Sequence, residues 1–474
     1  MKIIISILLL CIISFSARSQ DTHYWSHQYG PKSTLLGGSD AAVSKDNSAI
    51  INNPGGLGFN DQASLSVTTN AYSVDFMKFK DGAGAGLDMK STKVHSIPLI
   101  LSGVFKHKKH PKWTVGYALV DRVRYKFEAT QRFDDMINVI DDGYSPGQEE
   151  FVSQLDMRNR LKEIWAGFTI AYRINEHFAV GMSNFGAYRD HQFSSQYTAR
   201  AVINSPFLFE TSTSDFLYNV SYISVRNIFK LGVTASFDNF DAGLSVTMPS
   251  FNMYSRAIVN SDLTSSNVII DDVTNTRGSI IANDRQEKLP ANYKSPFSVS
   301  LGLSKQFKKT RLFVTSEYFA GIKQYVYISP KNNSFIRPAA LFGGSSSEIL
   351  QVAGGKKPVL NIAIGVEQQL SEKLTLMAGI RTDNSFYDES AEDIGNSLSF
   401  TSASLYHASA GVSIERAKGK VCIGLKGSYG SNTLDQEVNL TNPQDNLILM
   451  GDTYTTQYTY YNVSFVLGYI HYLK

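Results

Sequence analysis

The chain is 474 residues long, with 43% hydrophobic residues, 18% charged residues and a formal net charge of +3. Bases and acids almost balance, which excludes a protein that binds nucleic acid through a dense field of basic residues. The chain has 25 Tyr, 28 Phe and 35 Gly but only 13 Pro, a composition that suits a β-barrel whose strands are apolar on one face.

Residues 1–19 have the pattern of a secretory signal peptide. A basic Lys2 precedes an apolar stretch at 3–16, and a small-x-small cleavage pattern follows. The apolar stretch is too short for a membrane-spanning helix, and no later window is long and apolar enough to be one. The mature chain keeps a single cysteine, Cys422, so we expect a secreted protein without an internal disulfide.

Residues 20–62 show no alternation and are rich in small and turn-forming residues. An Asn-Pro pair followed by two glycines restricts the geometry of the chain here. We expect this segment to pack inside a barrel as a compact plug, or hatch; the alternative is a mobile periplasmic tail. The expected hatch motif consists of Gly37, Gly38, Asp46, Ser48, Asn53, Pro54, Gly55 and Gly56.

Most of the remaining chain, 63–474, alternates apolar and polar residues with a period of two. In 360–367, for example, Leu and Ile alternate with Asn, Ala and Gly, which places each set on one face of a strand. The pattern predicts about fourteen strands, an even number, as expected for a single-chain bacterial barrel. The predicted strands are 63–79, 93–107, 112–133, 160–174, 177–200, 215–238, 240–258, 288–307, 310–329, 358–370, 373–386, 398–415, 419–432 and 454–472.

The links between these strands alternate strictly between short and long. The expected short links are 108–111, 175–176, 238–239, 308–309, 371–372 and 416–420, and the long ones include 134–159, 259–287, 330–357 and 433–453. Tight periplasmic turns and long extracellular loops are typical of outer-membrane barrels. An even strand count then places both ends of the barrel on the periplasmic side.

Alternation alone does not separate a membrane barrel from a soluble β-sandwich, but the position of the aromatic residues favours the barrel. Amphipathic rings prefer the boundary between membrane and water. Such rings near predicted strand ends are Tyr172, Phe178, Tyr188, Tyr318, Tyr461 and Tyr469.

Glycines recur on the less apolar face of the predicted strands. A row of small residues facing the lumen would make room for a plug or a narrow substrate path. The alternative is that glycine relieves crowding in a tightly curved wall. These glycines are Gly167, Gly181, Gly232, Gly243, Gly302, Gly365, Gly379, Gly411, Gly424 and Gly468.

The N-terminal segment resembles the opening of the outer-membrane long-chain fatty-acid transporter (FadL/TodX-type) family. That family carries a D-x-S-A-x-x-x-N-P-A-G-L-like motif, and here Gly55 stands in place of the motif's alanine. Further short matches at 242–249, 289–303 and 364–381 extend the resemblance over nearly the whole mature chain. The residues that match the motif are Asp46, Ser48, Ala49, Asn53, Pro54, Gly56 and Leu57.

This resemblance implies a fourteen-strand barrel closed by an N-terminal hatch, in the outer membrane of a Gram-negative-type cell. It also implies that hydrophobic small molecules, fatty-acid-like or aromatic hydrocarbons, are taken up by passive diffusion. Small movements of the hatch would open and close the path. One departure concerns the substrate. The expected link 134–159 is rich in Asp and Glu, which is unusual at an entrance for fatty acids.

Apolar side chains near the long links are candidates for substrate capture, since each buried methylene contributes about 0.8 kcal/mol. Arg381 on the lumen face is a candidate partner for a carboxylate. The alternative is that the apolar residues pack the loops together, and that lumen-facing Arg381, Lys230, Glu317, Glu367 and Lys426 pair with each other or with the hatch. The expected capture residues are Phe151, Leu155, Phe207, Phe209 and Arg381.

We expect no cofactor, no metal and no catalytic residues. His23 and His27 lie four residues apart, but a third ligand is not nearby, and no G-x-S-x-G elbow stands in a suitable context. The expected partners are a hydrophobic small molecule and outer-membrane lipid, and not nucleic acid. The alternative function is a structural barrel subunit of an outer-membrane secretion or assembly complex.

Overall fold

The computed structural model describes residues 22–106, 109–140, 142–207, 209–271, 274–337, 344–399 and 402–473. The predicted signal peptide, 1–19, lies outside the described residues. Within them, no helix is long and apolar enough to cross a membrane.

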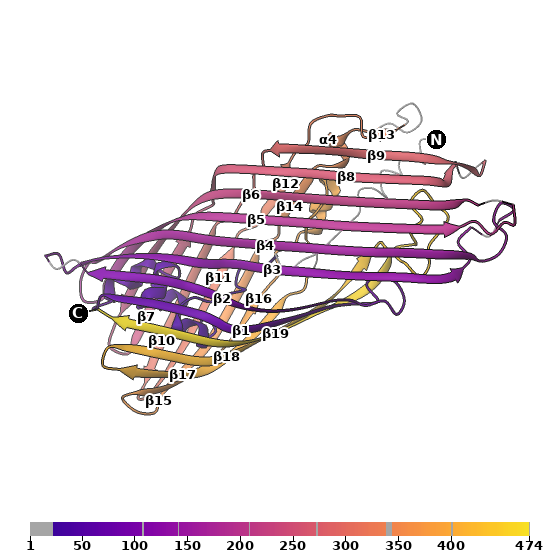
Figure 1. The fold of residues 1–474 in the computed structure, drawn as a ribbon. Helices are drawn as coiled ribbons and strands as arrows, with labels where there is room; N and C mark the ends of the chain where they lie inside the picture. Colours follow the sequence, from indigo (N-terminus) through magenta and orange to yellow (C-terminus); the bar gives the residue numbers. More distant parts are fainter. Residues whose placement is uncertain are drawn as a thin grey trace.

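The strands form one closed antiparallel barrel with fourteen positions in its wall (Figure 1). The first strand pairs with the last over its whole length, which closes the barrel and removes open edges. The wall strands are β1 (Ser64–Lys80), β2 (Met89–Lys106), β3 (Trp113–Ile137), β4 (Glu149–Arg173), β5 (Phe178–Val202), β6 (Thr211–Ser236), β7 (Phe240–Thr247), β8 (Phe251–Asp271), β9 (Thr276–Leu289), β10 (Ser298–Phe307), β11 (Thr310–Phe319), β15 (Val359–Gln369), β16 (Leu374–Asp383), β17 (Leu405–Arg416), β18 (Gly419–Gln436) and β19 (Tyr454–Tyr472).

Two neighbouring positions of the wall are occupied by broken strands. One end of β6 pairs with β7 and the rest pairs with β8, so β7 and β8 share a position that breaks at 248–250. Likewise β9 pairs with β8 and β10 pairs with β7, with a break at 290–297. Both breaks contain proline, which cannot donate a ladder hydrogen bond. The backbone N–H of Ser295 donates to Ser250 Oγ (2.9 Å), so the two breaks lie side by side.

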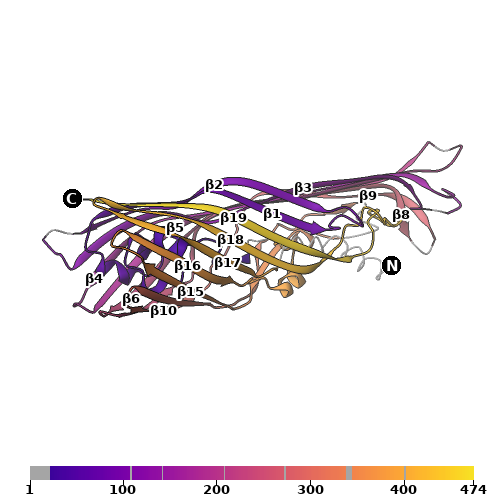
Figure 2. The ribbon, with the colours of Figure 1, turned by 90° about the horizontal axis from the view of Figure 1, so that it is seen from below.

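The short links are confirmed, and all lie at one end of the barrel (Figure 1). The start of β1 and the end of β19 lie at the same end. The backbone N–H of Leu473 donates to the carbonyl of Ala63 (2.8 Å). At the opposite end, β3 to β6, β8 and β9 extend as one tall wall beyond the other strands (Figures 1 and 2).

The predicted long links 134–159 and 259–287 are wrong in extent, because strands occupy most of each. β3 runs to Ile137 and β4 starts at Glu149, and only 272–275 separate β8 from β9. The inward row of β4 stays buried here, but its outward row is largely polar or charged, including Asp156 and Arg158. The apolar outer face that marks a strand inside a membrane is therefore missing, although the strand continues.

The predicted long link 330–357 contains short elements that lie within the tall side of the barrel. They are β13 (Ile336–Arg337), α4 (Ser346–Ile349) and β14 (Val352–Lys356). β14 pairs in a separate two-stranded sheet with β12 (Ile322–Ile328), which lies in the predicted strand 310–329, so that strand ends earlier than predicted, at Phe319. The link after β18 is confirmed as irregular from 437 to 453.

The outer surface carries an apolar band of the kind that faces lipid. On β3 the outward residues Trp113, Val115, Tyr117 and Leu119 are 44% to 48% exposed, and the exposed residues of the same row then become charged from Arg124 onward. Aromatic pairs line the edge of the band at the short-link end. The ring centroids of Trp113 and Tyr172, for example, lie 4.8 Å apart. The apolar face of the strands points outward, as predicted for a membrane barrel.

Residues 22–62 fill the lumen at the short-link end (Figure 1). This segment, which we call the hatch, is built from one turn of α-helix and three short 3-10 helices rather than strands. They are α2 (Pro31–Leu35), η2 (Ala41–Val43), η3 (Asn47–Ile50) and η4 (Pro54–Phe59).

Most of the ten lumen-facing glycines form the surface on which the hatch rests. A Cβ at Gly243 would lie 1.6 Å from the carbonyl oxygen of Ala42, and one at Gly379 would lie 2.0 Å from that of Leu36. Similar contacts with the hatch occur at Gly181, Gly232, Gly302, Gly365, Gly411, Gly424 and Gly468, whereas Gly167 meets only the wall. The prediction that these glycines make room for a plug is confirmed for nine of the ten positions.

We predict that Gly243→Ala destabilises the protein by about 1–3 kcal/mol, because the added methyl group overpacks the hatch against the wall. Gly186→Ala is the matched control, since a Cβ there has its nearest neighbour at 3.8 Å. Urea unfolding in detergent and limited proteolysis of the hatch measure the effect. Equal stability and equal cleavage rates for the two variants would show that the hatch does not rest on this surface.

Candidate substrate cavity

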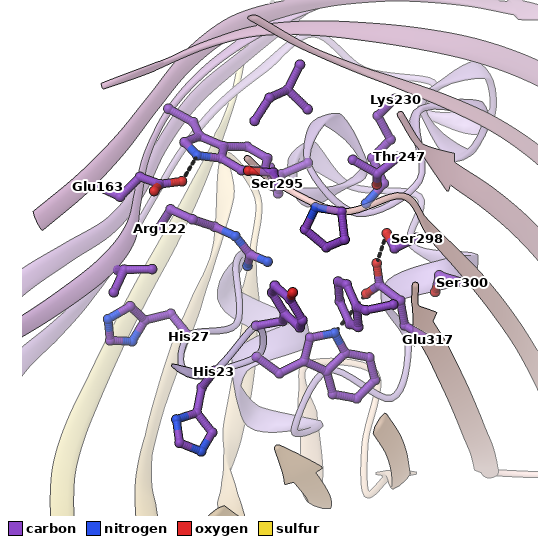
Figure 3. Close-up of a pocket in the computed structure, with 18 of the residues that line it drawn as sticks. His23, His27, Arg122, Glu163, Lys230, Thr247, Ser295, Ser298, Ser300 and Glu317 are labelled. Carbon is purple, nitrogen blue, oxygen red and sulfur yellow. Dashed lines mark hydrogen bonds between the residues drawn. The ribbon is translucent and has the colours of Figure 1, made fainter. Parts of the chain in front are cut away.

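A cavity of about 90 Å³ lies between the hatch and the middle of the wall. Its lining comes from hatch residues before and after α2, from the inward faces of β3 to β6, from the broken segment at 293–296 and from residues of β7, β10, β11 and β14. Figure 3 shows Arg122 and Glu163 across this cavity from Glu317. The cavity therefore touches the wall at the place where two strands are broken.

Glu163 holds two arginines on one side of the cavity. Its Oε2 lies 2.9 Å from Arg189 Nη1 and 2.7 Å from Arg226 Nη2, and its Oε1 accepts from Trp165 Nε1 (2.7 Å). The Glu163 residue is 4% exposed and Arg226 is fully buried. A buried carboxylate bound by two guanidinium groups fixes three strands, β4, β5 and β6, relative to one another.

Glu317 ties the hatch to the other side of the cavity. Trp25 Nε1 donates to Glu317 Oε2 (2.7 Å), and Ser298 Oγ donates to Glu317 Oε1 (2.7 Å). The side-chain oxygens of Glu317 are thus both engaged by uncharged donors.

Two cations of the cavity remain without an ion pair to any residue that the structure describes. Lys230 is 9% exposed, and Arg122 donates only to the hydroxyl of Tyr29 (3.4 Å) while stacking 5.3 Å from the Trp165 ring. Glu317 acts on both cations without a direct ion pair. The lining nevertheless holds more cations than carboxylates, so the cavity has a net positive charge.

Tyr293 places the broken segment against this charged cluster. Three cations flank its ring, with Arg189, Arg226 and Lys356 at 4.1, 4.9 and 4.5 Å from the centroid. Lys356 Nζ also donates to the Tyr293 hydroxyl (2.8 Å). A second cavity of about 50 Å³ adjoins this cluster and is lined by Tyr222, Tyr325 and Tyr327 among others. Cation–π contacts of this kind hold the segment inward.

His27 lies at the same cavity, 8% exposed, and neither ring nitrogen has a hydrogen-bond partner among the described residues. Burial, together with the nearby Lys426 and Arg381, holds the pKa of His27 well below its usual range. The imidazole is therefore neutral at physiological pH and adds no charge to the cavity.

The hatch motif residues stabilise the hatch and its contact with the wall. Asp46 caps η3 by accepting from the backbone N–H of Ser48 (2.8 Å). Asn53 Nδ2 donates to the carbonyls of Ala42 (2.6 Å) in the hatch and Val233 (3.0 Å) in β6. Gly37 and Gly38 have φ of +66° and +84° and turn the chain after α2.

Ion pairs fasten the hatch at the short-link end. Lys45 Nζ lies 2.7 Å from Asp241 Oδ1 on β7, and Arg311 on β11 contacts the same carboxylate. Lys32 Nζ lies 2.5 Å from Glu367 Oε2 on β15. The lumen-facing carboxylates Glu317 and Glu367 therefore contact the hatch. This is the alternative that the sequence left open for them.

The predicted capture residues are not brought together. Phe151 and Leu155 are fully buried in an apolar cluster above the cavity, which also contains Phe127, Tyr197 and Leu449 and which we call the upper apolar cluster. Tyr197 donates to the carbonyl of Leu449 (2.6 Å), so the link 437–453 helps to close the far end of the lumen.

The other three predicted capture residues lie elsewhere. Phe207 and Phe209 are 88% and 101% exposed in the link between β5 and β6, at the end of the tall wall. Arg381 is buried on β16, and its Nη2 donates to the carbonyl of Ser26 in the hatch (3.2 Å). Their roles in capture stay predictions.

Arg122, Glu163, Arg189 and Tyr293 are site residues that the sequence reasoning missed. The signal was present for two of them: Glu163 and Arg189 are charged residues on inward rows, between apolar or aromatic neighbours. Tyr293 lies in a broken segment whose sequence does not alternate, so the sequence does not predict whether its side chain points inward or outward.

We predict that Glu163→Gln lowers the free energy of unfolding by about 3–5 kcal/mol, because it leaves two buried guanidinium groups without a carboxylate. Glu150→Gln, at an exposed position of the same strand, is the control and should change it by less than about 0.5 kcal/mol. Urea unfolding in detergent measures both. A loss below about 1 kcal/mol for Glu163→Gln would contradict a stabilising role for the cluster.

No protein-family profile matches the sequence, and no curated protein matches it at a significant level. Solved structures do match. A FadL homologue from Pseudomonas aeruginosa is 13% identical, and the alignment covers 95% of this chain and 100% of the other, with a TM-score of 0.60. The toluene transporter TodX from Pseudomonas putida is 15% identical, with 94% and 98% covered and a TM-score of 0.54.

The toluene transporter TbuX from Ralstonia pickettii is 13% identical over 94% of this chain and 98% of its own, with a TM-score of 0.54. At these identities the likeness concerns the fold, and it covers 94% to 95% of this chain. The chain therefore has the fold of the FadL/TodX-type hydrophobic-substrate transporters, a fourteen-strand barrel closed by an N-terminal hatch.

Proposed function

We propose that this chain is an outer-membrane channel that takes up hydrophobic small molecules by passive diffusion, gated by its hatch. The observation that carries the proposal is the internal cavity, which lies between the hatch, the upper apolar cluster and the broken part of the wall. The fold supports the same conclusion, since similar solved structures are described as toluene transporters and a FadL homologue. We also infer from these neighbours that the chain is not an enzyme.

The size of the cavity supports gating. Sites for drug-sized ligands usually enclose about 300–1,000 Å³, whereas this cavity has about 90 Å³. The hatch and the packed links close the lumen at both ends, so a ligand enters only when these parts move. The described conformation is therefore that of a closed channel.

The charge of the cavity favours an amphiphile with a negative head over a neutral hydrocarbon. Arg122 and Lys230 make no direct ion pair with a described residue, although Glu317 acts on both through space. Aromatic rings of Trp25, Trp165 and Phe319 belong to the same lining. A carboxylate would supply the missing counter-charge, while its hydrocarbon chain would gain about 0.8 kcal/mol per methylene in the apolar region above. A fatty-acid-like molecule fits both features.

The broken wall gives such a ligand a route to the membrane. Tyr293, Ser295 and Pro296 of the broken segment line the cavity, and Met248, Phe251 and Met253 on its outer side are 39%, 61% and 68% exposed. We propose that the ligand leaves through this part of the wall.

The scaffold alternative has less support, because the solved structures with this fold are described as transporters or channels. A scaffold also has no need for a cavity with an excess of cations in its lumen.

Uptake into vesicles tests the proposal. The wild-type protein should take up a fluorescent long-chain fatty acid and the fatty alcohol of equal length. Arg122→Gln combined with Lys230→Gln should lower uptake of the acid by at least about tenfold, since hydrogen bonds to charged groups are worth about 1.5–3 kcal/mol. Uptake of the alcohol should stay within about twofold.

The matched control is Lys80→Gln, an exposed cation at the far end of β1. An equal loss for acid and alcohol in the double variant would refute the headgroup role of the two cations. Failure of the wild-type protein to take up either ligand would refute the proposed function as a whole.

A further inference from the structure

Six exposed cations gather on three consecutive hairpins at the short-link end of the barrel. The hairpins are β10–β11, β15–β16 and β17–β18. In the described turns of these hairpins, Glu372 is the single exposed carboxylate. The half-buried Glu415 pairs with Lys420 (3.1 Å), and the exposed Asp435 lies at the opposite end of β18. We call the six cations the basic arc: Lys305, Lys308, Lys309, Lys373, Arg416 and Lys418.

Two members of the basic arc continue rows of residues that face lipid. Lys305 follows Leu301 and Leu303 on the outward row of β10, and these leucines are 51% and 44% exposed. Its Nζ lies 5.5 Å from the ring centroid of Phe307, the next outward residue. Arg416 ends the outward row of β17, which includes the 59% exposed Tyr406. Both side chains therefore start from the lipid-facing surface.

The four other cations lie in the turns directly beyond the same surface. Leu312, Leu370 and Leu376, on the strands or turns beside them, are 46%, 49% and 41% exposed. Aromatic rings such as Phe307 prefer the level of the lipid headgroups. The basic arc consequently lies where the apolar band ends and the headgroups begin.

None of the cations of the basic arc has an ion-pair partner among the described residues. Some exposed arginines at the tall end are paired, such as Arg132 with Asp134 at 2.8 Å and Arg285 with Glu287 at 2.7 Å. A cation that is already paired with a carboxylate of the protein attracts an anionic ligand only weakly. The basic arc presents uncompensated charge to its surroundings.

We propose that the basic arc binds the headgroups of anionic phospholipids in the leaflet at the short-link end. A basic residue near an anionic membrane surface raises binding by about fivefold. An acidic protein could contact the turn lysines, but it would not reach the outward-facing Lys305 and Arg416 inside the lipid layer. The inference rests on the membrane placement in the proposed function, and it does not depend on transport.

Lipid retention tests this inference. The full chain is reconstituted in nanodiscs that contain phosphatidylglycerol and phosphatidylcholine in equal amounts, and native mass spectrometry measures which lipid stays bound. We expect the wild-type protein to retain phosphatidylglycerol in at least about tenfold excess. The variant Lys305→Gln, Lys308→Gln, Lys373→Gln and Arg416→Gln should lose most of this preference.

The control variant neutralises four exposed cations that lie away from the short-link end: Lys80→Gln, Arg158→Gln, Lys162→Gln and Arg256→Gln. It should keep the wild-type preference. In 1 M salt, where the Debye length is about 3 Å, the preference of the wild-type protein should decrease. Fatty-alcohol uptake confirms that each variant is folded, because this readout does not involve the lipid headgroups.

An unchanged lipid ratio in the basic-arc variant, or no preference in the wild-type protein, would overturn the inference. Capture of an acidic periplasmic protein by the wild-type chain, with lipid ratios equal in all variants, would assign the arc to a protein instead and would equally overturn it. A wild-type protein that retains phosphatidylglycerol but takes up no ligand would refute the proposed function and leave the lipid site standing.

Discussion

The structure depends on the contact between the backbone of the hatch and a lumen wall surfaced with glycine. A barrel of fourteen strands encloses more space than its own inward side chains fill at the short-link end, and the hatch occupies that space. Because a Cβ at Gly243 would lie 1.6 Å from the Ala42 carbonyl, the wall and the hatch fit only where the wall has no side chain. Strands β5, β6, β7, β10 and β15 to β19 all contribute glycines to this contact, so the position of the hatch is defined from most of the circumference.

Because the hatch fills the lumen, it also determines which partners the charged side chains of the lumen contact. Near the short-link end, wall carboxylates pair with hatch lysines, as in Lys45–Asp241 and Lys32–Glu367. Higher up, Glu163 pairs within the wall with Arg189 and Arg226. Between these two levels Arg122 and Lys230 make no direct ion pair with a described residue, and the wall beside them is broken. Incomplete pairing and the interrupted ladder coincide at the cavity, which is the reason for placing substrate there.

Much of the fold was predictable, because a period of two survives wherever one face of a strand meets lipid. The alternation of Leu360, Ile362 and Ile364 with small residues located β15, and the short links fixed the ends of the strands. The tall wall was missed, since charged residues such as Arg158 and Lys162 replace the apolar outer face there. The glycines indicated a filled lumen, and the Asn53-Pro54 segment indicated what fills it. The cavity was less accessible to prediction: it joins residues from many separate parts of the chain, between His23 and Phe386, and Tyr293 lies where no periodic pattern exists.

The central claim is that the hatch must move for a ligand to pass, and a reversible cross-link between hatch and wall tests it most directly. A Cβ at Gly365 would lie 3.2 Å from the Cβ of Ser39 and 2.9 Å from the carbonyl oxygen of Leu36. A shift of the hatch by a few tenths of an ångström relieves the second contact and brings the two Cβ atoms to the separation in a disulfide, about 3.5–4.5 Å. Ser39→Cys with Gly365→Cys is made in a Cys422→Ser background, with Gly365→Cys alone as control, and uptake of a fluorescent fatty acid is measured. The account predicts that uptake stops on oxidation and returns on reduction in the double variant alone. Equal uptake by the oxidised and reduced double variant would contradict it.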